Sequence, residues 1–312
     1  TISGTPTTTV GSPFSYTVTL TGGCGSITAT GTITVNPDNS ITLTSAPGTD
    51  AQTVCVNTAI TNITYATTAA TGATFSVLPA GVTGNWAANV VTISGTPTTA
   101  VGSPFSYTVT LTGGGTCGTL TATGTITVTP NNTITLTSAA GTNAQTVCMN
   151  SPIANITYST TGATGATFSG LPAGVTGSWV ANVVTISGTP TTTVGSPFNY
   201  TVTLTGGCGV ITANGTITVN PLPVINSTQV EPSTCASADG SINITVSGAA
   251  GPYTFAWTGP GVNPTSEDQI NLTVGNYSVT VTAANGCTAT ANFALAGPGG
   301  CSICPTIPTF VT

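Results

Sequence analysis

The sequence predicts an all-β protein made of tandem β-sandwiches, and two observations support this prediction. The first is a long internal repeat: the hexamer TISGTP begins at Thr1, Thr92 and Thr185, so its spacings are 91 and 93 residues. A repeat of that length matches one sandwich domain and is too long for one turn of a solenoid. The second observation is a regular alternation of apolar and polar residues inside each repeat.

This alternation is clearest between Phe198 and Leu204, where every second residue is apolar and Asn or Thr fills the positions between. A period of two residues is that of a half-buried strand. Segments such as Ser187–Pro190 combine Gly and Pro and supply the turns between strands. No window has a helical period, and β-branched Thr, Val and Ile dominate throughout.

Residues 1–36 correspond to the second half of a repeat, with strands expected near Thr1–Ser3, Phe14–Leu20 and Ser26–Val35. Such a half would expose unpaired strand edges by itself. We expect the first half to lie upstream in a longer chain. The alternative is that another chain donates the missing strands.

Residues 37–129 form one complete repeat, and residues 130–220 form the next. Seven short strands at this spacing predict a Greek-key sandwich. The junctions Asn36-Pro37, Thr129-Pro130 and Asn220-Pro221 leave almost no linker, which predicts stiff joints. The strands expected in the first complete repeat lie near Ser40–Thr44, Gln52–Val56, Asn62–Thr67, Ala73–Val77, Asn85–Ser94, Phe105–Thr112 and Gly118–Thr129.

The pattern changes after Pro223, and residues 221–297 form a different unit. We expect Cys235 and Cys287 to pair, with Trp257 packed on the disulfide as in immunoglobulin-like cores. Residues 298–312 carry Cys301 and Cys304 and open the next unit or a linker. The strands expected in this unit lie near Ser241–Ser247, Tyr253–Thr258, Asn276–Ala283 and Thr288–Leu295.

The nine cysteines recur at fixed places in the repeats. An early cysteine follows AQTV, at Cys55 and Cys148, and a late cysteine follows LTGG or LTGGGT, at Cys24, Cys117 and Cys208. One early and one late cysteine per repeat predicts the disulfides Cys55–Cys117 and Cys148–Cys208, and places the partner of Cys24 upstream. Disulfides indicate an oxidising, extracellular setting, whereas the alternative is free buried thiols.

The charge composition excludes several classes of function. The chain has no Lys, Arg or His and only six acids among 312 residues. Without cations it cannot neutralise phosphates, which excludes nucleic-acid and anionic-membrane binding. No run approaches 18 apolar residues, so no membrane insertion is expected. Catalytic Ser-His-Asp or Cys-His sets are impossible, and the adjacent Glu267 and Asp268 do not suit a facing carboxylate pair. We therefore predict no enzymatic activity and no cofactor.

Metal binding has only weak candidates. Asp239, Glu267 and Asp268 are carboxylates in one domain, and Ca²⁺ favours such ligands, but the DxDxDG spacing is missing. Cys301 and Cys304 have the spacing of half a zinc site without a second pair, so disulfide cysteines are favoured. The sequence therefore predicts no metal site.

Trp86 and Trp179 occupy equivalent places in the segments TGNWAAN and TGSWVAN. Exposed aromatic rings at such places would form a candidate glycan contact. The favoured alternative is that both rings belong to the core or cover the end of a domain.

Two segments resemble known families. The pattern LPAGV…VVTISGTPTT…FSYTVTLTGGC resembles immunoglobulin-like repeats of bacterial surface proteins, above all the long repetitive exoproteins of Bacteroidetes. The segments GPYTFAW and VGNYSVTVTAANGC resemble the SprB-type repeat of a gliding-motility adhesin, although Ala283 stands where that family usually has an acid. The resemblance implies tandem immunoglobulin-like Greek-key sandwiches joined end to end, in a giant adhesin or filament exported by the type IX route.

The expected function is a structural rod in this extracellular adhesin or filament, serving cell adhesion and gliding motility. Its expected partners are neighbouring repeats of the same longer chain, surface polysaccharide or another cell-surface protein. Three whole units and a half would extend on the order of 120–150 Å. The alternatives are an array of carbohydrate-binding modules and an accessory region of a large exoenzyme.

Overall fold

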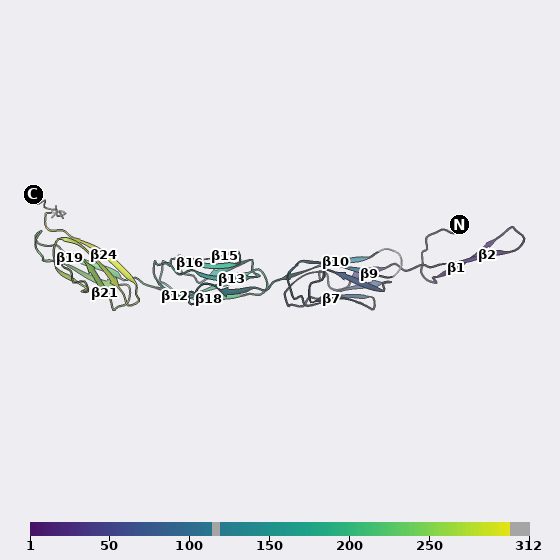
Figure 1. The fold of residues 1–312 in the computed structure, drawn as a ribbon, viewed down its shortest axis with the longest axis horizontal. Helices are drawn as coiled ribbons and strands as arrows, with labels where there is room; N and C mark the ends of the chain where they lie inside the picture. The colour runs from purple at the N-terminus through teal and green to yellow at the C-terminus, as the bar shows by residue number, and fades with distance from the viewer. Residues whose placement is uncertain (114–118, 300–312) are drawn as a thin grey trace, which may run out of the picture. The chain divides into compact units, whose positions relative to one another are not determined.

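The computed structural model describes residues 1–113 and 119–299, which fold into strands joined by turns and loops (Figure 1). In this described part, no helix is present that could cross a membrane. Packing divides the chain into two compact units. The first comprises residues 1–133 with the loops 161–164 and 206–210, and the second comprises the remaining segments from Ile134 onward.

The first unit begins with a two-stranded antiparallel hairpin, β1 (Phe14–Leu20) and β2 (Ile27–Ile33). The apolar side chains that alternate along it stay largely in solvent, and Tyr16 is 37% exposed. The strand expected near Thr1–Ser3 does not form. The equivalent strand of the next repeat needs two neighbours, which this hairpin lacks.

A complete sandwich follows in the same unit. Its two sheets have the strand orders β3-β5-β8-β7 and β4-β10-β9-β6. The chain changes sheets between β3 and β4, so that β4 pairs in parallel with β10, the last strand. The strands are β3 (Ser40–Leu43), β4 (Ala51–Cys55), β5 (Ile63–Thr68), β6 (Gly72–Ser76), β7 (Val82–Ala87), β8 (Val90–Gly95), β9 (Phe105–Thr112) and β10 (Thr121–Thr129).

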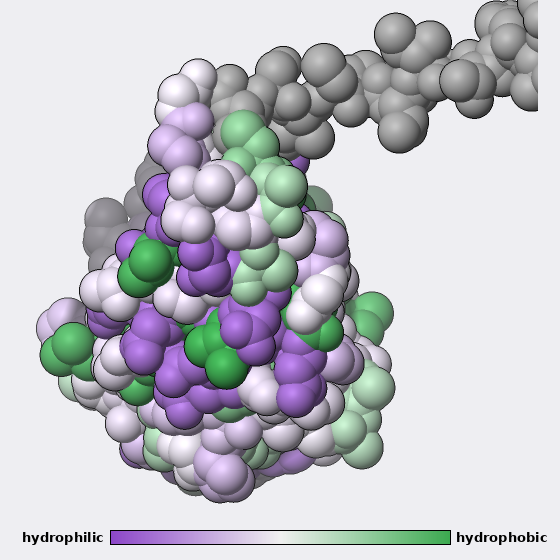
Figure 2. Space-filling view, turned by 90° about the vertical axis from the view of Figure 1, so that its left-hand side faces the viewer, coloured by the Kyte–Doolittle hydropathy of each residue, from purple (hydrophilic) through white to green (hydrophobic). Residues whose placement is uncertain are grey.

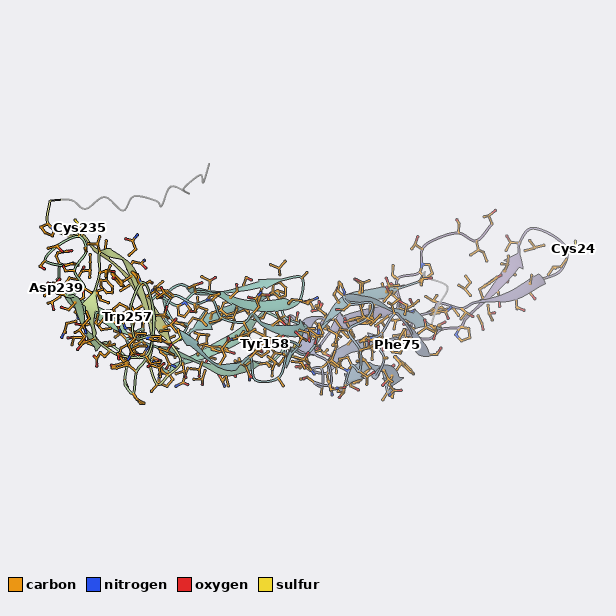
Figure 3. The ribbon with its side chains drawn as sticks, turned by 60° about the vertical axis from the view of Figure 1, so that its left-hand side comes forward. Cys24, Phe75, Tyr158, Cys235, Asp239 and Trp257 are labelled. Atoms are coloured by element: carbon orange, nitrogen blue, oxygen red, sulfur yellow. A yellow bond between two sulfur atoms is a disulfide. The ribbon has the colours of Figure 1, made fainter. Side chains whose placement is uncertain are left out.

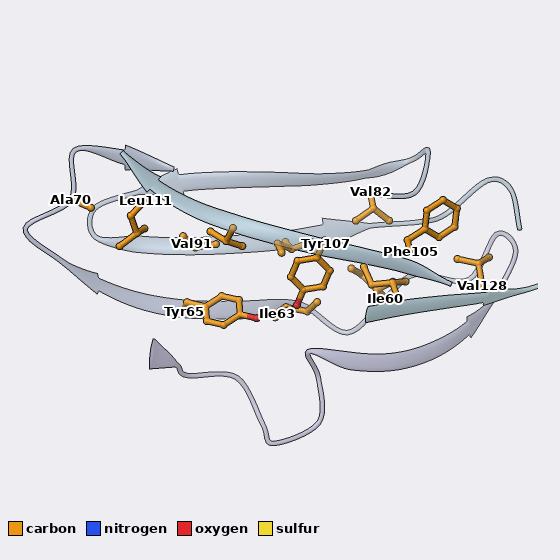
Figure 4. Close-up of a cluster of buried hydrophobic side chains, with 13 residues drawn as sticks. Ile60, Ile63, Tyr65, Ala70, Val82, Val91, Phe105, Tyr107, Leu111 and Val128 are labelled. Carbon is orange, nitrogen blue, oxygen red and sulfur yellow. Dashed lines mark hydrogen bonds between the residues drawn. The ribbon is translucent and has the colours of Figure 1, made fainter. Parts of the chain in front are cut away.

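The core of this sandwich collects the apolar side chains that alternate inward from both sheets (Figure 4). Tyr107, the counterpart of Tyr16, is 1% exposed here. Its hydroxyl lies 3.1 Å from that of Tyr65 across the core. Each buried phenol therefore has its polar end satisfied, as buried polar groups require.

The sandwich has eight strands where seven were expected. The segment Asn85–Ser94, predicted to be one strand, is a hairpin of β7 and β8 that turns at Ala88 and Asn89. Both turn residues have positive φ, of 46° and 63°. Two such residues form the tight turn that suits twisted hairpin strands, and Asn tolerates this conformation.

The second unit contains a sandwich of the same plan, with sheets β11-β13-β16-β15 and β12-β18-β17-β14. Tyr158 and Tyr200 repeat the tyrosine pair, with their hydroxyls 3.0 Å apart. The strands are β11 (Thr133–Leu136), β12 (Ala144–Cys148), β13 (Ile156–Thr161), β14 (Gly165–Ser169), β15 (Val175–Val180), β16 (Val183–Gly188), β17 (Phe198–Thr205) and β18 (Thr212–Asn220).

The last sandwich, also in the second unit, has two three-stranded sheets, β19-β20-β22 and β21-β23-β24. Its core contains Trp257, whose ring lies 5.7 Å from that of Phe293 and whose Nε1 donates to Ser266 O. Strands β19 and β22 were not expected from the sequence. The strands are β19 (Val224–Val230), β20 (Gly240–Ser247), β21 (Thr254–Thr258), β22 (Gln269–Leu272), β23 (Gly275–Thr282) and β24 (Thr288–Leu295).

Candidate functional site

The strand pairing places each early cysteine at the end of its sandwich from which the chain leaves. Cys55 ends β4, and in the parallel register it lies opposite Thr129, the last residue of β10. Val56 N continues this pairing by donating to Thr129 O. Because Pro130 follows Thr129 directly, Cys55 lies beside the joint that leads to the next repeat.

Cys55 forms a disulfide with Cys208, and the two Cα atoms are 5.7 Å apart. Cys208 lies in the loop between β17 and β18, in the segment 206–210 that packs as part of the first unit. The disulfide therefore joins the early cysteine of one repeat to the late cysteine of the following repeat. We call this arrangement a forward disulfide.

Backbone and side-chain hydrogen bonds surround this disulfide and form the first joint. Asn132 N donates to Cys208 O, and Cys208 N donates to Pro130 O. The Asn132 side chain is 5% exposed, and its Nδ2 donates to Gly206 O and Gly209 O, each at 2.8 Å. One amide group thus fixes both sides of the cysteine loop.

The glycines before Cys208 are needed for this fit. Gly207 has a φ of +61°, and a Cβ there would lie 2.1 Å from Asn132 Oδ1 and 2.3 Å from Gly162 O. Any larger residue would collide with side chain and backbone at once. The motif LTGGC noted in the sequence is therefore the loop that receives the forward disulfide.

The second joint, in the second unit, follows the same plan with different residues. Cys148 ends β12 opposite Asn220, the last residue before Pro221, and bonds to Cys287. Cys287 lies in the turn between β23 and β24 of the last sandwich. Here Asn285 Nδ2 donates to Pro221 O at 3.1 Å, while Asn285 Oδ1 accepts from Cys287 N at 3.0 Å.

The predicted disulfides Cys55–Cys117 and Cys148–Cys208 are wrong, because Cys55 bonds to Cys208 and Cys148 to Cys287. In the second complete repeat, the early cysteine Cys148 and the late cysteine Cys208 lie near opposite ends of one long strand. β18, nine residues long, separates Cys208 near its start from Cys148 opposite its last residue. That separation is about 25–30 Å at about 3.3 Å per residue, whereas a disulfide needs Cα atoms within about 7 Å.

The predicted disulfide Cys235–Cys287, with Trp257 packed on it, is wrong for the same reason. The chain after β19 lies beside the end of β24, because Ala296 N donates to the carboxylate of Glu231. Cys287 lies at the start of β24, eight residues away along the strand. Cys235 is nevertheless disulfide-bonded.

The other cysteines complete this inventory. Cys24 is free and exposed at the tip of the β1–β2 hairpin (Figure 3). Cys117, Cys301 and Cys304 lie outside the described residues.

The three acids considered for calcium have other roles or none. Asp239 Oδ1 accepts from Ser233 N, and hydrogen bonds from Ser233 and Ser237 lower the pKa of Asp239 to about 2. Asp268 accepts from Ile244 N at 2.9 Å, and Glu267 is exposed. Within the described ranges, His, Cys, Asp and Glu form no group of three that could hold a metal ion.

Trp86 and Trp179 are half-buried, on β7 and β15. Their indole N–H groups point inward, donating to Thr67 Oγ1 and Thr160 Oγ1, each at 3.0 Å. One edge of each ring is therefore used by the sandwich. Glycan contact at these rings stays a prediction.

Sequence reasoning missed Asn132, Asn285 and the role of the glycine pair Gly206-Gly207. One signal was available, since Asn39 and Asn132 both follow the joint proline by two residues. In the preceding repeat Asn39 Nδ2 donates to Gly113 O, which matches the contact of Asn132 with Gly206. An Asn recurring at this place indicates a contact that the two repeats share after Pro37 and Pro130.

Comparisons with known proteins agree with these sandwiches. Residues 227–262 match the family model described as SprB repeat. The I-band fragment I67-I69 of titin matches with a TM-score of 0.51 at 11% identity, covering 85% of this chain and 99% of that chain. A three-immunoglobulin E-to-A variant of the same titin fragment matches with a TM-score of 0.50, at the same identity and coverage. No curated protein sequence matches the chain.

At 11% identity the titin match shows the fold alone. The SprB match also indicates the kind of protein in which such repeats occur. SprB repeats come from cell-surface proteins, and both kinds of repeat are structural rather than enzymatic. The disulfides agree with an extracellular location. The chain is a repeat protein of immunoglobulin-like sandwiches and carries a SprB-type repeat at residues 227–262.

Proposed function

We propose that this chain is a spacer in a secreted cell-surface adhesin or filament, exported by the type IX route and serving adhesion and gliding motility. In this role its sandwiches hold a binding element, located elsewhere in the parent chain, away from the cell. The ligand of that element would be surface polysaccharide or another cell-surface protein. The partners of the segment itself are the neighbouring repeats.

One observation above all supports the proposal: successive sandwiches are connected twice, by a short proline joint and by a forward disulfide. A double connection restricts hinge motion between neighbouring sandwiches. A spacer needs this restriction, whereas an enzyme that forms a cleft between its domains does not. One face of the molecule supports it too. The face in Figure 2 mixes strongly hydrophilic side chains with weakly polar ones and a few separate hydrophobic ones. Scattered hydrophobic residues of this kind do not mark a binding patch.

Small-angle scattering on the full chain tests the spacer. We expect a maximum dimension of about 120–150 Å from units stacked end to end, against about 60 Å for a compact protein of this length. A maximum dimension near the compact value would contradict the proposal.

A second test separates a spacer from an array of glycan-binding modules. The spacer predicts that the chain is not retained on surface polysaccharide, and that Trp86→Ala and Trp179→Ala leave this unchanged. Retention that both substitutions abolish while the fold persists would favour the array instead.

A further inference from the structure

The two forward disulfides close loops of the chain that overlap. The Cys55–Cys208 disulfide spans 153 residues, and the Cys148–Cys287 disulfide spans 139. Residues 148–208 belong to both loops. Disulfides inside single repeats, as first expected, would close separate loops and leave the chain between them unprotected.

Overlap changes what a single backbone break does. If the chain is cut between Cys55 and Cys208, the first disulfide still connects its two sides. If it is cut between Cys208 and Cys287, residues 148–208 and the second disulfide carry the connection. Every peptide bond from Cys55 to Cys287 is therefore bypassed by at least one disulfide.

We propose that the forward disulfides make this segment tolerant of cleavage: no single backbone cut between Cys55 and Cys287 severs the chain. This rests on the covalent connections alone and holds whatever the adhesin binds. It adds to the proposed spacer a second property, which is that the tether survives extracellular proteases after a first cut.

This property matters most between the late cysteine of one repeat and the early cysteine of the next. A protease reaches exposed loops and turns more readily than strands. Ala140, for example, is exposed in a turn that lies after Cys117 and before Cys148. With disulfides confined to single repeats, a cut there would separate the chain. With forward disulfides, Cys55–Cys208 bypasses it.

The composition provides a clean experiment. The chain has no Lys or Arg, so trypsin has no site in it until one lysine is introduced. Val10, Val101 and Val194 are the same position in successive repeats, and each is 83–85% exposed. Val10→Lys places the cut before Cys55, outside both loops, whereas Val101→Lys places it inside the first loop and Val194→Lys inside both. Ala140→Lys places it between Cys117 and Cys148, inside the first loop only.

Each variant is digested to completion, as a reducing gel verifies, and then run without reductant. We expect the Val10→Lys protein to separate into two fragments on both gels. The Val101→Lys, Ala140→Lys and Val194→Lys proteins should run as one molecule without reductant and as two with it. Separation of the Ala140→Lys protein without reductant would overturn the proposal, whatever small-angle scattering shows about the spacer.

Removal of one disulfide tests the overlap itself. Cys208→Ala should release the Ala140→Lys protein on the non-reducing gel, because only the first disulfide spans residue 140. The same substitution should leave the Val194→Lys protein connected, because Cys148–Cys287 also spans residue 194. Release of the Val194→Lys protein by Cys208→Ala alone would show that the loops do not overlap. Cys24→Ala is the matched control and should change neither result.

Discussion

The two joints each contain a forward disulfide, but the hydrogen bonds around it differ. In the first joint the chain after the proline provides Asn132, which reaches into the glycine loop of Cys208. In the second joint the contact is reversed, because Asn285 of the cysteine turn reaches back to Pro221. What both share is an early cysteine opposite the last residue before the proline. The forward disulfide is thus the feature that the two joints have in common, whereas different residues provide the hydrogen bonds around it.

If the forward disulfide sets the strength of a joint, its removal should cost the same in both joints. The loops of 153 and 139 residues predict nearly equal losses, each about 5 kcal/mol of unfolding free energy in the chain-entropy model. The comparison pairs Cys55→Ala/Cys208→Ala with Cys148→Ala/Cys287→Ala in denaturant unfolding. A difference of more than about 1.5 kcal/mol would mean that the surroundings, and not the disulfide, set the strength of a joint.

The glycine before each late cysteine should separate the joints most clearly. Gly207 and Gly286 both have positive φ, but a Cβ at Gly207 meets three atoms within 3 Å and a Cβ at Gly286 meets nothing within 4 Å. Gly207→Ala should therefore cost about 2–5 kcal/mol through strain and overpacking. Gly286→Ala should cost only the backbone strain, about 1–2 kcal/mol. Equal thermal shifts for the two variants would show that the first loop relaxes without loss.

The two asparagines should differ less. Asn132→Ala removes two hydrogen bonds from a buried amide and should cost about 1–3 kcal/mol. Asn285→Ala removes two bonds in a partly buried turn and should cost about 1–2 kcal/mol. Amide hydrogen exchange at Cys208 and Cys287 in the respective variants measures the loosening of each turn. Faster exchange at Cys287 than at Cys208 would reverse the expected order.

The smallest effect concerns the sandwiches around the joints at high pH. Burial first, and then the hydrogen bond that each donates to its partner tyrosine, raise the pKa of Tyr107 and of Tyr200 well above the usual value near 10. The neutral phenol is favoured in the folded state. The free energy of unfolding that this preference contributes is therefore fully present below pH 10 and is lost as the pH rises above 10. We expect about 1 kcal/mol per tyrosine to be lost between pH 10 and 11.

Tyrosine absorbance during alkaline unfolding measures this loss. Tyr107→Phe should reduce the alkaline sensitivity of the first sandwich, where burial also raises the pKa of Tyr65, and should leave that of the second sandwich unchanged, since Tyr200 remains. A Tyr107→Phe protein in which the alkaline sensitivity of the first sandwich is not reduced would contradict the assignment.

The sequence predicts strands well where alternation is strong. β9 (Phe105–Thr112) and β24 (Thr288–Leu295) have the predicted bounds, because in each every second side chain is more buried than its neighbours. It failed at Asn85–Ser94, where the turn residues Ala88 and Asn89 carry no Gly or Pro to mark a hairpin. The sequence also did not predict β22 of the last sandwich, because this strand is only four residues long.

The disulfide partners could not be predicted for a different physical reason. One early and one late cysteine per repeat suit a disulfide within the repeat and a disulfide to the next repeat equally well. The deciding fact is the direction of one short strand, since β4 runs parallel to β10 and brings Cys55 to the exit of the sandwich. No residue pattern in AQTVC specifies whether its strand pairs in parallel. Only the three-dimensional pairing separates the two cysteines of one repeat.

The forward disulfide also constrains how such a chain can evolve. Recombination between like repeats inserts or deletes one early and one late cysteine together, so a longer or shorter array keeps every thiol matched. Replacement of a repeat by an unrelated domain is harder. The new domain must have a cysteine in the turn before its last strand, because otherwise the early cysteine of the preceding repeat is left unpaired. The SprB-type sandwich, which shares neither sequence nor strand number with the repeats, meets this demand at Cys287. The forward disulfide thus limits which domains can follow a repeat, and duplication of a repeat always meets this requirement.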